Sequence, residues 1–367
     1  LHNTYVYRVP PYRVSAPDFE TWVAQLNVAL LERALSLPEV LEGVQIVHAH
    51  DWLVAYAARA LKHGRRLPLV ATMHATEYGR HNGLHNDVQR HISDVVWWLT
   101  LASWRLICCS RFMEDQLRSV FNLPADKIRV IPNGVDPEEF RFRAGRVERA
   151  HFAAPDERIV FYVGRLVREK GVQVLLAAAP MILAEEPCVK FVIAGRGPYE
   201  RELRGLAERL GVAPRVYFTG YVDQETRNAL YHWADVAVFP SLYEPFGLVV
   251  LEAMAARTPV VVSDTGGFTE IVQHEVNGLK VFPDNPRSLA DGVLRILRDP
   301  GLALVLRERA YRRVLREFTW ERAARMTREV YREVWQSYQQ TPWRLERDRA
   351  ARFLGRLQQL WVPGRLS

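Results

Sequence analysis

Two basic side chains, Arg165 and Lys170, stand five residues apart after an apolar run that ends at Gly164. The run predicts a buried strand, and the flanking glycines predict a loop that leads into a helix near Gly171. Arginine donates two parallel hydrogen bonds, lysine brings a compact charge, and a helix N-terminus attracts anions. The spacing therefore indicates a diphosphate-binding loop, although two solvated surface cations would give the same pattern.

Two carboxylates, Glu244 and Glu252, lie eight residues apart after a short apolar run. Pro245 fits the first position of a helix, where its missing N–H costs nothing. Eight residues make about two helical turns, so both carboxylates would lie on one helix face and could bind sugar hydroxyl groups. The helix N-terminus would present the N–H groups of Phe246, Gly247 and Leu248. In the alternative interpretation, Glu244 is a helix cap and Glu252 is solvated.

A histidine, His74, follows the apolar run 67–73 and opens a polar loop. The same loop contains Glu77, Tyr78 and Arg80. Isolated histidines are mostly structural, but this one stands at the carboxyl end of a predicted parallel strand, where ligands bind in such sheets. We therefore predict a functional role for His74.

The segment His48–Trp52 follows an earlier predicted strand and contains two histidines, an aspartate and a tryptophan. Asp51 has the residue type of a helix N-cap, and a capping role alone would explain it. His50 and Trp52 could instead line a sugar site, with Trp52 stacking on the sugar ring. Composition alone leaves both interpretations open.

Two glycine turns give weaker signals. One is the strand-to-helix turn Gly195–Pro198, and the other is Thr265–Gly267, whose backbone N–H groups could approach a phosphate. Neither matches the Gly-x-Gly-x-x-Gly pattern, so a dinucleotide cofactor is not indicated. The chain also lacks a Gly-Lys-Ser/Thr loop, which argues against phosphoryl transfer from ATP.

These segments alternate with amphipathic stretches along the whole chain. In the first half the predicted strands are Val44–His48, Leu67–Met73, Arg105–Cys109 and Lys127–Ile131. Between them the predicted helices are Thr21–Leu37, Trp52–His63, Asp87–Ser103 and Arg111–Phe121. In the second half the predicted strands are Ile159–Val163, Val189–Ala194, Val216–Thr219, Val236–Phe239, Pro259–Ser263 and Gly278–Val281. Alternating strands and helices predict an α/β protein with parallel sheets covered on both faces.

Composition narrows the class of protein. The chain has 367 residues, a net charge of +7 and 49 basic residues, of which only five are lysines. The arginines are spread along predicted helices and no nucleic-acid module is recognisable, so we expect no nucleic-acid partner. A peripheral membrane contact is disfavoured, because the predicted helix 21–37 carries few positive charges. Three cysteines without metal-ligand spacing, and no apolar run of membrane length, favour a cytoplasmic protein with reduced thiols.

The chain is long enough for two domains. We expect an N-terminal Rossmann-like domain over residues 1–150 and a second over residues 151–318, joined within residues 132–155. Residues 319–340 are expected to form a helix that packs back toward the first domain, and residues 341–367 a basic tail. The oligomeric state is left open by the sequence.

Taken together, these segments resemble the retaining glycosyltransferases of family 4, which have the GT-B fold of two Rossmann-like domains facing a central cleft. The pair Glu244 and Glu252 looks like the family's Glu-x7-Glu signature. Gly164-Arg165, Lys170-Gly171, Pro132–Asp136 and Gly266-Gly267 fall in the expected order around it. Within the family, His50–Trp52 and His74–Tyr78 look most like bacterial and archaeal glycogen or starch synthases.

The resemblance implies a role for each matching position. His74, Arg165, Lys170 and Glu244 would form the catalytic centre, with the two cations on the donor diphosphate. The remaining donor-binding positions would be Arg196, Gly220, Tyr221, Phe246, Gly247, Leu248, Glu252, Gly266 and Gly267, with Glu252 on the ribose. The acceptor would face His50, Asp51, Trp52, Glu77, Tyr78, Arg80 and Asn133. The fold needs no metal ion or cofactor, and the chain has no Asp-x-Asp motif.

The implied reaction is transfer of a hexose, as glucose from ADP-glucose or UDP-glucose, to an oligosaccharide or α-glucan acceptor with retained configuration. One alternative keeps the enzyme class but changes the acceptor to a lipid or a small sugar phosphate. Another is a non-catalytic protein that binds sugar nucleotides or glucans. Turnover of a nucleotide sugar separates this last interpretation from the other two.

The family pattern also includes a first strand and a glycine-rich loop that this sequence lacks. Residues 1–43 contain a single glycine, Gly43. The first strand of such a sheet is usually central, so its absence would leave neighbouring strands unpaired. We therefore expect a fragment whose N-terminal half folds poorly and whose activity is low.

Overall fold

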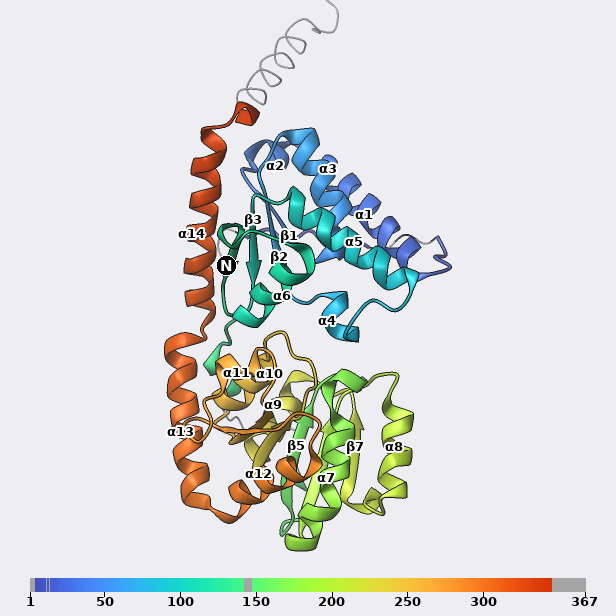
Figure 1. Ribbon diagram of the computed structural model, residues 1–367, viewed down its shortest axis with the longest axis vertical. Helices are drawn as coiled ribbons and strands as arrows, with labels where there is room; N and C mark the ends of the chain where they lie inside the picture. Colours follow the sequence, from blue (N-terminus) through green and yellow to red (C-terminus); the bar gives the residue numbers. More distant parts are fainter. Residues whose placement is uncertain (1–3, 11, 13, 142–146, 345–367) are drawn as a thin grey trace, which may run out of the picture.

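The computed structural model describes residues 4–10, 12, 14–141 and 147–344 of the chain. Two lobes are stacked along the long axis of the molecule, and the last two helices run along the side of both (Figure 1). We call residues 19–135 the N-terminal lobe and residues 158–317 the C-terminal lobe. None of the helices that the structure describes is both long and apolar enough to cross a bilayer.

The N-terminal lobe is built on a four-stranded parallel sheet in the order β1-β2-β3-β4. Its strands are β1 (Val47–His50), β2 (Leu69–Met73), β3 (Arg105–Cys108) and β4 (Ile128–Val130). Its helices are α1 (Phe19–Leu35), α2 (Pro38–Gly43), η1 (Trp52–Val54), α3 (Ala55–Arg65), α4 (Glu77–His81), α5 (Asp87–Ala102), α6 (Arg111–Phe121) and η2 (Ala125–Lys127). All five residues of β2 are buried, so helices cover both faces of the sheet centre.

Strand β1 begins three residues later than the prediction Val44–His48 and ends at His50. The backbone of the next strand explains the difference. Val47 donates its N–H to the carbonyl of Pro68 (3.0 Å), and Pro68 has no N–H with which to extend the ladder. The shift places His50 inside the strand together with His48, on the same face of the sheet. Among the described residues β1 pairs only with β2. How well this lobe folds in solution stays a prediction.

The C-terminal lobe has a six-stranded parallel sheet in the order β10-β9-β8-β5-β6-β7. Its strands are β5 (Arg158–Val163), β6 (Val189–Ala194), β7 (Val216–Gly220), β8 (Val236–Phe239), β9 (Val260–Ser263) and β10 (Leu279–Val281). Its helices are η5 (Arg168–Lys170), α7 (Val172–Glu185), α8 (Glu200–Arg209), η6 (Ala213–Arg215), α9 (Gln224–Trp233), α10 (Leu248–Ala255), α11 (Phe268–Ile271), α12 (Pro286–Arg298) and α13 (Pro300–Glu317). Four successive residues of β5, 159–162, are buried, so this sheet is covered on both faces.

The two lobes are joined by segments that lie side by side. Residues 132–141, with η3 (Pro137–Phe140), begin the first crossing, η4 (Arg149–His151) follows before β5, and α14 (Trp320–Gln339) makes the return. Val135 donates its N–H to the carbonyl of Phe318 (2.9 Å). A Cβ on Gly134 would lie 2.3 Å from the backbone of Thr319, so only glycine allows this approach.

The C-terminal helical segment is divided at this crossing into α13 and α14. Thr319 is extended and its side chain caps α14, so α13 ends at Glu317. α14 lies along the N-terminal lobe (Figure 1). Its buried Val330 and Val334 form a cluster with apolar side chains of β2 and β3. The tail predicted over 341–367 lies outside the described residues from 345 onward.

Candidate active site

A cavity of about 310 Å³ lies between the lobes. Its walls come from the residues that follow β2, β3, β5 and β8, together with the start of α10. In parallel sheets the carboxyl ends of the strands share one edge, which is where ligands bind. Of the predicted catalytic residues, all four line it: His74, Arg165, Lys170 and Glu244.

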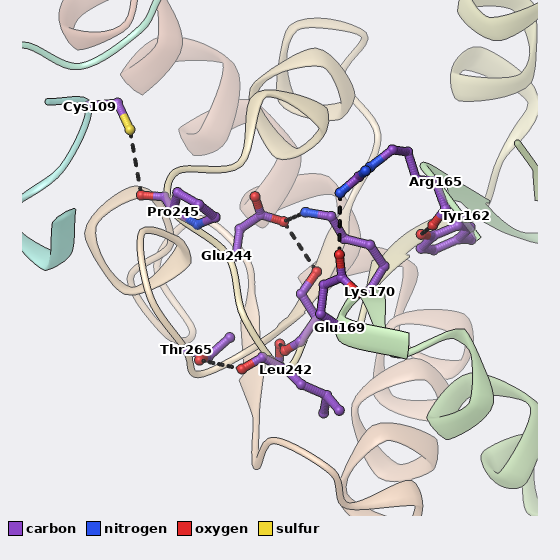
Figure 2. Close-up of polar contacts among 11 residues, drawn as sticks. Cys109, Tyr162, Arg165, Glu169, Lys170, Leu242, Glu244, Pro245 and Thr265 are labelled. Carbon is purple, nitrogen blue, oxygen red and sulfur yellow. Dashed lines mark hydrogen bonds and ion pairs between the residues drawn. The ribbon is translucent and has the colours of Figure 1, made fainter. Parts of the chain in front are cut away.

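Each of the two predicted phosphate-binding cations is paired with a carboxylate. Lys170 Nζ lies 2.7 Å from Glu244 Oε2, and Ser241 donates its hydroxyl to the same oxygen (3.2 Å). Arg165 Nη2 lies 3.3 Å from Glu169 Oε1 (Figure 2). Glu244 is 7% exposed, so its charge is stabilised by these two donors instead of by water. An incoming anion would compete with the carboxylates for the same cations.

The loop that carries Lys170 is held close to its neighbour by a glycine. Gly171 has φ +72°, and a Cβ there would lie 1.8 Å from the carbonyl oxygen of Pro240. Only glycine tolerates both the backbone angle and the contact. This packing places Lys170 beside Glu244, which follows Pro240 by four residues.

The structure corrects the predicted helix after Glu244. α10 begins at Leu248, and Pro245 is in a loop instead of at the first helical position. Gly247 explains the late start, because its φ of +115° lies outside the helical region. Glu244 therefore shares no helix face with Glu252. Phe246, Gly247 and Leu248 do line the cavity, and α10 directs its N-terminus toward it.

Glu252 does not line this cavity, so its expected role on the donor ribose stays a prediction. Its carboxylate lies 3.2 Å from Arg227 Nη1 and accepts a hydrogen bond from Tyr231 (3.0 Å). Burial raises the pKa of Glu252, and Arg227 and Tyr231 act in the opposite direction. The two signature carboxylates are thus held by different partners.

On the N-terminal side, Asp51 is tied to the loop that begins with His74. Its carboxylate accepts the backbone N–H of His74 (2.8 Å), and its own N–H bonds to the carbonyl of Thr72 (2.9 Å). It makes no side-chain cap hydrogen bond to the following helix, so the capping interpretation is wrong. With φ 59° and ψ −177°, Asp51 adopts a backbone conformation that is almost confined to glycine. The hydrogen bonds of Asp51 to Thr72 and His74, at the end of β2, offset the free-energy cost of this backbone conformation.

Three histidines are stacked beside this aspartate. The ring of His50 lies between those of His48 and His74, with centroid distances of 4.5 Å and 5.3 Å. His48 contacts Tyr331 of α14 through Nδ1 (2.6 Å) and Thr72 through Nε2 (2.8 Å). Burial lowers the pKa of His48 to about 4, with smaller contributions from the other two histidines. His48 is therefore neutral at pH 7.

Family models match both halves of the chain: "Glycosyltransferase Family 4" over residues 3–139 and "Glycosyl transferases group 1" over residues 146–313. An uncharacterised glycosyltransferase of Methanocaldococcus jannaschii is 40% identical over 90% of this chain and 85% of its own length. The chain belongs to glycosyltransferase family 4. A glycogen synthase of Mycobacterium tuberculosis is 38% identical to this glycosyltransferase over 86% of this chain and 76% of its own length.

The fold is GT-B. The sucrose-phosphate synthase of Thermosynechococcus elongatus superposes with a TM-score of 0.76 at 30% identity, covering 90% of this chain and 83% of that one. The two parallel-sheet lobes with a cavity between them agree with the architecture expected from the sequence.

Only some of the predicted acceptor-side residues of this glycosyltransferase line the cavity. Arg80 and Asn133 line the cavity, whereas Glu77 and Tyr78 do not. Glu77 is instead bonded to His81 (3.0 Å), one helical turn away on α4. Trp52 is also absent from the wall of this cavity, and its stacking on a sugar ring stays a prediction.

Trp52 packs edge-on against Phe19 of α1, at a centroid distance of 5.9 Å. It lines a separate apolar hollow between α1 and α3. Trp52 is the first residue of η1 and lines this hollow, whereas His74 lines the cavity between the lobes. Residue type alone could not reveal that placement.

Several predicted donor-binding residues support loops instead of lining the cavity. Gly267 donates its N–H to the carbonyl of Glu244 (2.8 Å), and a Cβ on Gly266 would lie 2.0 Å from that oxygen. Both glycines thus hold the Glu244 loop in place. Arg196 lies beside Gly220, and Tyr221 is 74% exposed; none of the three is in the cavity wall.

Sequence reasoning missed a contact between the lobes that closes the cavity on one side. Tyr243 donates its hydroxyl to Gln116 of α6 (2.9 Å) and packs on Gly79, where a Cβ would lie 2.4 Å away. Ser110 donates its hydroxyl to the carbonyl of Pro245 (2.6 Å). The only available signal for Tyr243 was its place next to Glu244.

A second missed contact involves Glu270 of α11. Its carboxylate accepts the N–H groups of Arg111 and Phe112, both at 3.0 Å, and so caps α6 from the opposite lobe. Cys109 also lines the cavity. Burial raises the pKa of its thiol to about 12, so the thiol stays protonated and is a poor nucleophile. Among the described residues, no three His, Cys, Asp or Glu side chains lie close enough to hold a metal ion together.

Proposed function

We propose that this glycosyltransferase transfers glucose from ADP-glucose or UDP-glucose to the end of an α-glucan, with retained configuration and without a metal ion. The observation that carries the proposal is the single cavity that His74 lines from the N-terminal lobe and Arg165, Lys170 and Glu244 line from the C-terminal lobe. The similarity to a glycogen synthase, 38% over 86% of the chain, supports the choice of acceptor.

In the proposed reaction the bond between the anomeric carbon of glucose and the diphosphate oxygen breaks. Negative charge grows on the leaving diphosphate, where Arg165, Lys170 and the N-terminus of α10 stabilise it. The acceptor hydroxyl oxygen bonds to the anomeric carbon on the face that the diphosphate leaves. Its proton passes to the leaving phosphate oxygen. Glu244 and His74 hold the glucose hydroxyl groups.

A second acceptor class has its own support. The sucrose-phosphate synthase that superposes with a TM-score of 0.76 is named for a sugar-phosphate product. A small sugar phosphate is therefore the runner-up acceptor. It would use the same donor chemistry, so only the acceptor distinguishes the two proposals.

The test offers purified protein ADP-glucose or UDP-glucose with maltooligosaccharides, and in parallel with hexose phosphates. Lengthening of the oligosaccharide by α-linked glucose is the expected result. Transfer only to a hexose phosphate supports the runner-up. Binding of a nucleotide sugar with no transfer to any acceptor would contradict both and favour a binding protein.

The phosphate-binding role is tested with two matched variants of one loop. Lys170→Met removes a cation that lines the cavity, and Arg168→Met removes an exposed cation two residues away that does not. Loss of one preorganised donor costs about 100- to 1000-fold in kcat. We expect that loss for Lys170→Met and less than a twofold change for Arg168→Met. Equal effects would reject the assignment.

A further inference from the structure

The rings of His50 and His74 are joined by a close nitrogen–nitrogen contact in addition to their stacking. Nδ1 of His50 lies 3.0 Å from Nε2 of His74, and the two rings are inclined by only 15°. This is a hydrogen bond between the last residue of β1 and the residue that directly follows the neighbouring strand β2. Only His74 of the pair lines the cavity.

A hydrogen bond between two neutral imidazoles restricts both rings. One nitrogen must carry the proton and the other must offer its lone pair. If His74 is protonated at Nε2, its Nδ1 is an acceptor; if Nε2 accepts from His50, its Nδ1 is a donor. The state of His50 thus decides what His74 offers to a ligand in the cavity.

His50 is itself held in place by its surroundings. His48 stacks on its other face at 4.5 Å and is bonded to Tyr331 and Thr72. Burial lowers the pKa of His50, His74 lowers it further, and Asp51 raises it. The neutral ring is therefore favoured at pH 7. The backbone of His74 is fixed separately by the carboxylate of Asp51 at 2.8 Å.

We propose that His50 is a positioning residue, which fixes the ring orientation and the tautomer of His74 so that its free nitrogen meets a donor-sugar hydroxyl group in one defined state. The inference rests on the proposed function for the role of the sugar. It assigns His50 to the donor half of the reaction, whereas the sequence had placed it on the acceptor side.

The kinetic test uses two substitutions of His50. His50→Phe keeps a flat ring in the stack but removes the hydrogen bond, and His50→Asn keeps a polar atom near the position of Nδ1. We expect His50→Phe to lower kcat/KM by about tenfold, a coupling typical of residues in contact. His50→Asn should recover most of the loss, and the acceptor KM should stay unchanged in both.

A double-mutant cycle decides whether His50 acts through His74. In a His74→Ala background, His50→Phe should change kcat/KM by less than twofold, because there is no ring left to position. If the tenfold loss persists in that background, or appears only in the acceptor KM, His50 contacts the acceptor directly and the inference is overturned.

A spectroscopic readout works without substrate. In protein labelled with 15N-histidine, the ring nitrogens of His74 should report a single tautomer in the wild type and a mixture in His50→Phe. His85, whose Nε2 contacts the carbonyl of His81 in the same lobe, should give unchanged signals and so reports that this lobe of the variant is folded. Identical His74 signals in both proteins would overturn the inference. If no donor is turned over by the wild type, the proposed function fails, and this readout still decides the positioning role.

Discussion

The two lobes support their parts of the site in different ways. In the C-terminal lobe, Arg165 and Lys170 follow β5, an interior strand between β8 and β6. In the N-terminal lobe, His48 and His50 lie on β1, an edge strand with only one fully buried residue. The C-terminal lobe supplies cations paired with carboxylates, and the N-terminal lobe supplies stacked histidines.

The difference shows where each half of the site gets its rigidity. The cations lie on loops of a sheet that its own consecutive helices cover. The histidines depend on α14, which arrives from the far end of the chain and contacts His48 through Tyr331 at 2.6 Å. We infer that the C-terminal half of the site tolerates changes in α14 and that the histidine half does not.

The largest effect is expected from the core of the C-terminal lobe. Phe161 is fully buried in β5 and packs edge-on against Tyr231, with centroids 5.2 Å apart. Phe161→Ala should lower the free energy of unfolding by about 3–5 kcal/mol, measured by urea denaturation. The exposed control Val305→Ala should change it by less than about 0.5 kcal/mol. Similar losses in both variants would contradict the assignment of the core.

A smaller and more local effect is expected from α14. Val334 is 1% exposed and packs with Val70 and Ile107. Val334→Ala should lower the free energy of unfolding by about 2 kcal/mol. It should also speed hydrogen exchange in β2 and β3 but not in β5. Arg332→Ala, on the exposed side of α14, is the control. Faster exchange in both lobes would show that they unfold together, and would contradict the inference that only the histidine half of the site depends on α14.

The histidine stack predicts a pH effect in the N-terminal lobe. His48 has a pKa of about 4 when folded and an ordinary value of 6.5. Between these values the unfolded chain binds more protons, so stability falls as the pH falls from 6.5 to 4. In His48→Gln the free energy of unfolding should decrease less over this pH range, by on the order of 1–2 kcal/mol. Identical pH profiles of urea midpoints for the two proteins would contradict a buried neutral His48.

The smallest effect is expected at the contact between the lobes. Glu270→Ala removes the cap of α6 that comes from the opposite lobe. This change should lower the free energy of unfolding by about 1 kcal/mol. Scattering in solution should then report a larger radius of gyration, because the lobes separate more readily. Glu308→Ala, which removes only a surface pair with Arg257, serves as the control and should leave the radius unchanged.

Much of the fold was predictable, because the strands are short apolar runs separated by amphipathic stretches. All ten described strands fall within or beside the predicted ones, and the parallel arrangement follows from the alternation. The loop with Arg165 and Lys170 could be found because two cations at a strand end are a local pattern. The placement of Trp52 could not, since its packing against Phe19 belongs to the tertiary structure.

Periodicity along the chain thus determined the elements, and charged or histidine residues at strand ends determined the edge at which a site would form. Only the tertiary structure decided which of these residues meet. A positive φ at Gly247 separates Glu244 from Glu252, and Asp51 turns from a cap into a support for His74. Such outcomes depend on contacts between segments far apart in sequence, such as α14 with β1 or α11 with α6, which local patterns do not encode.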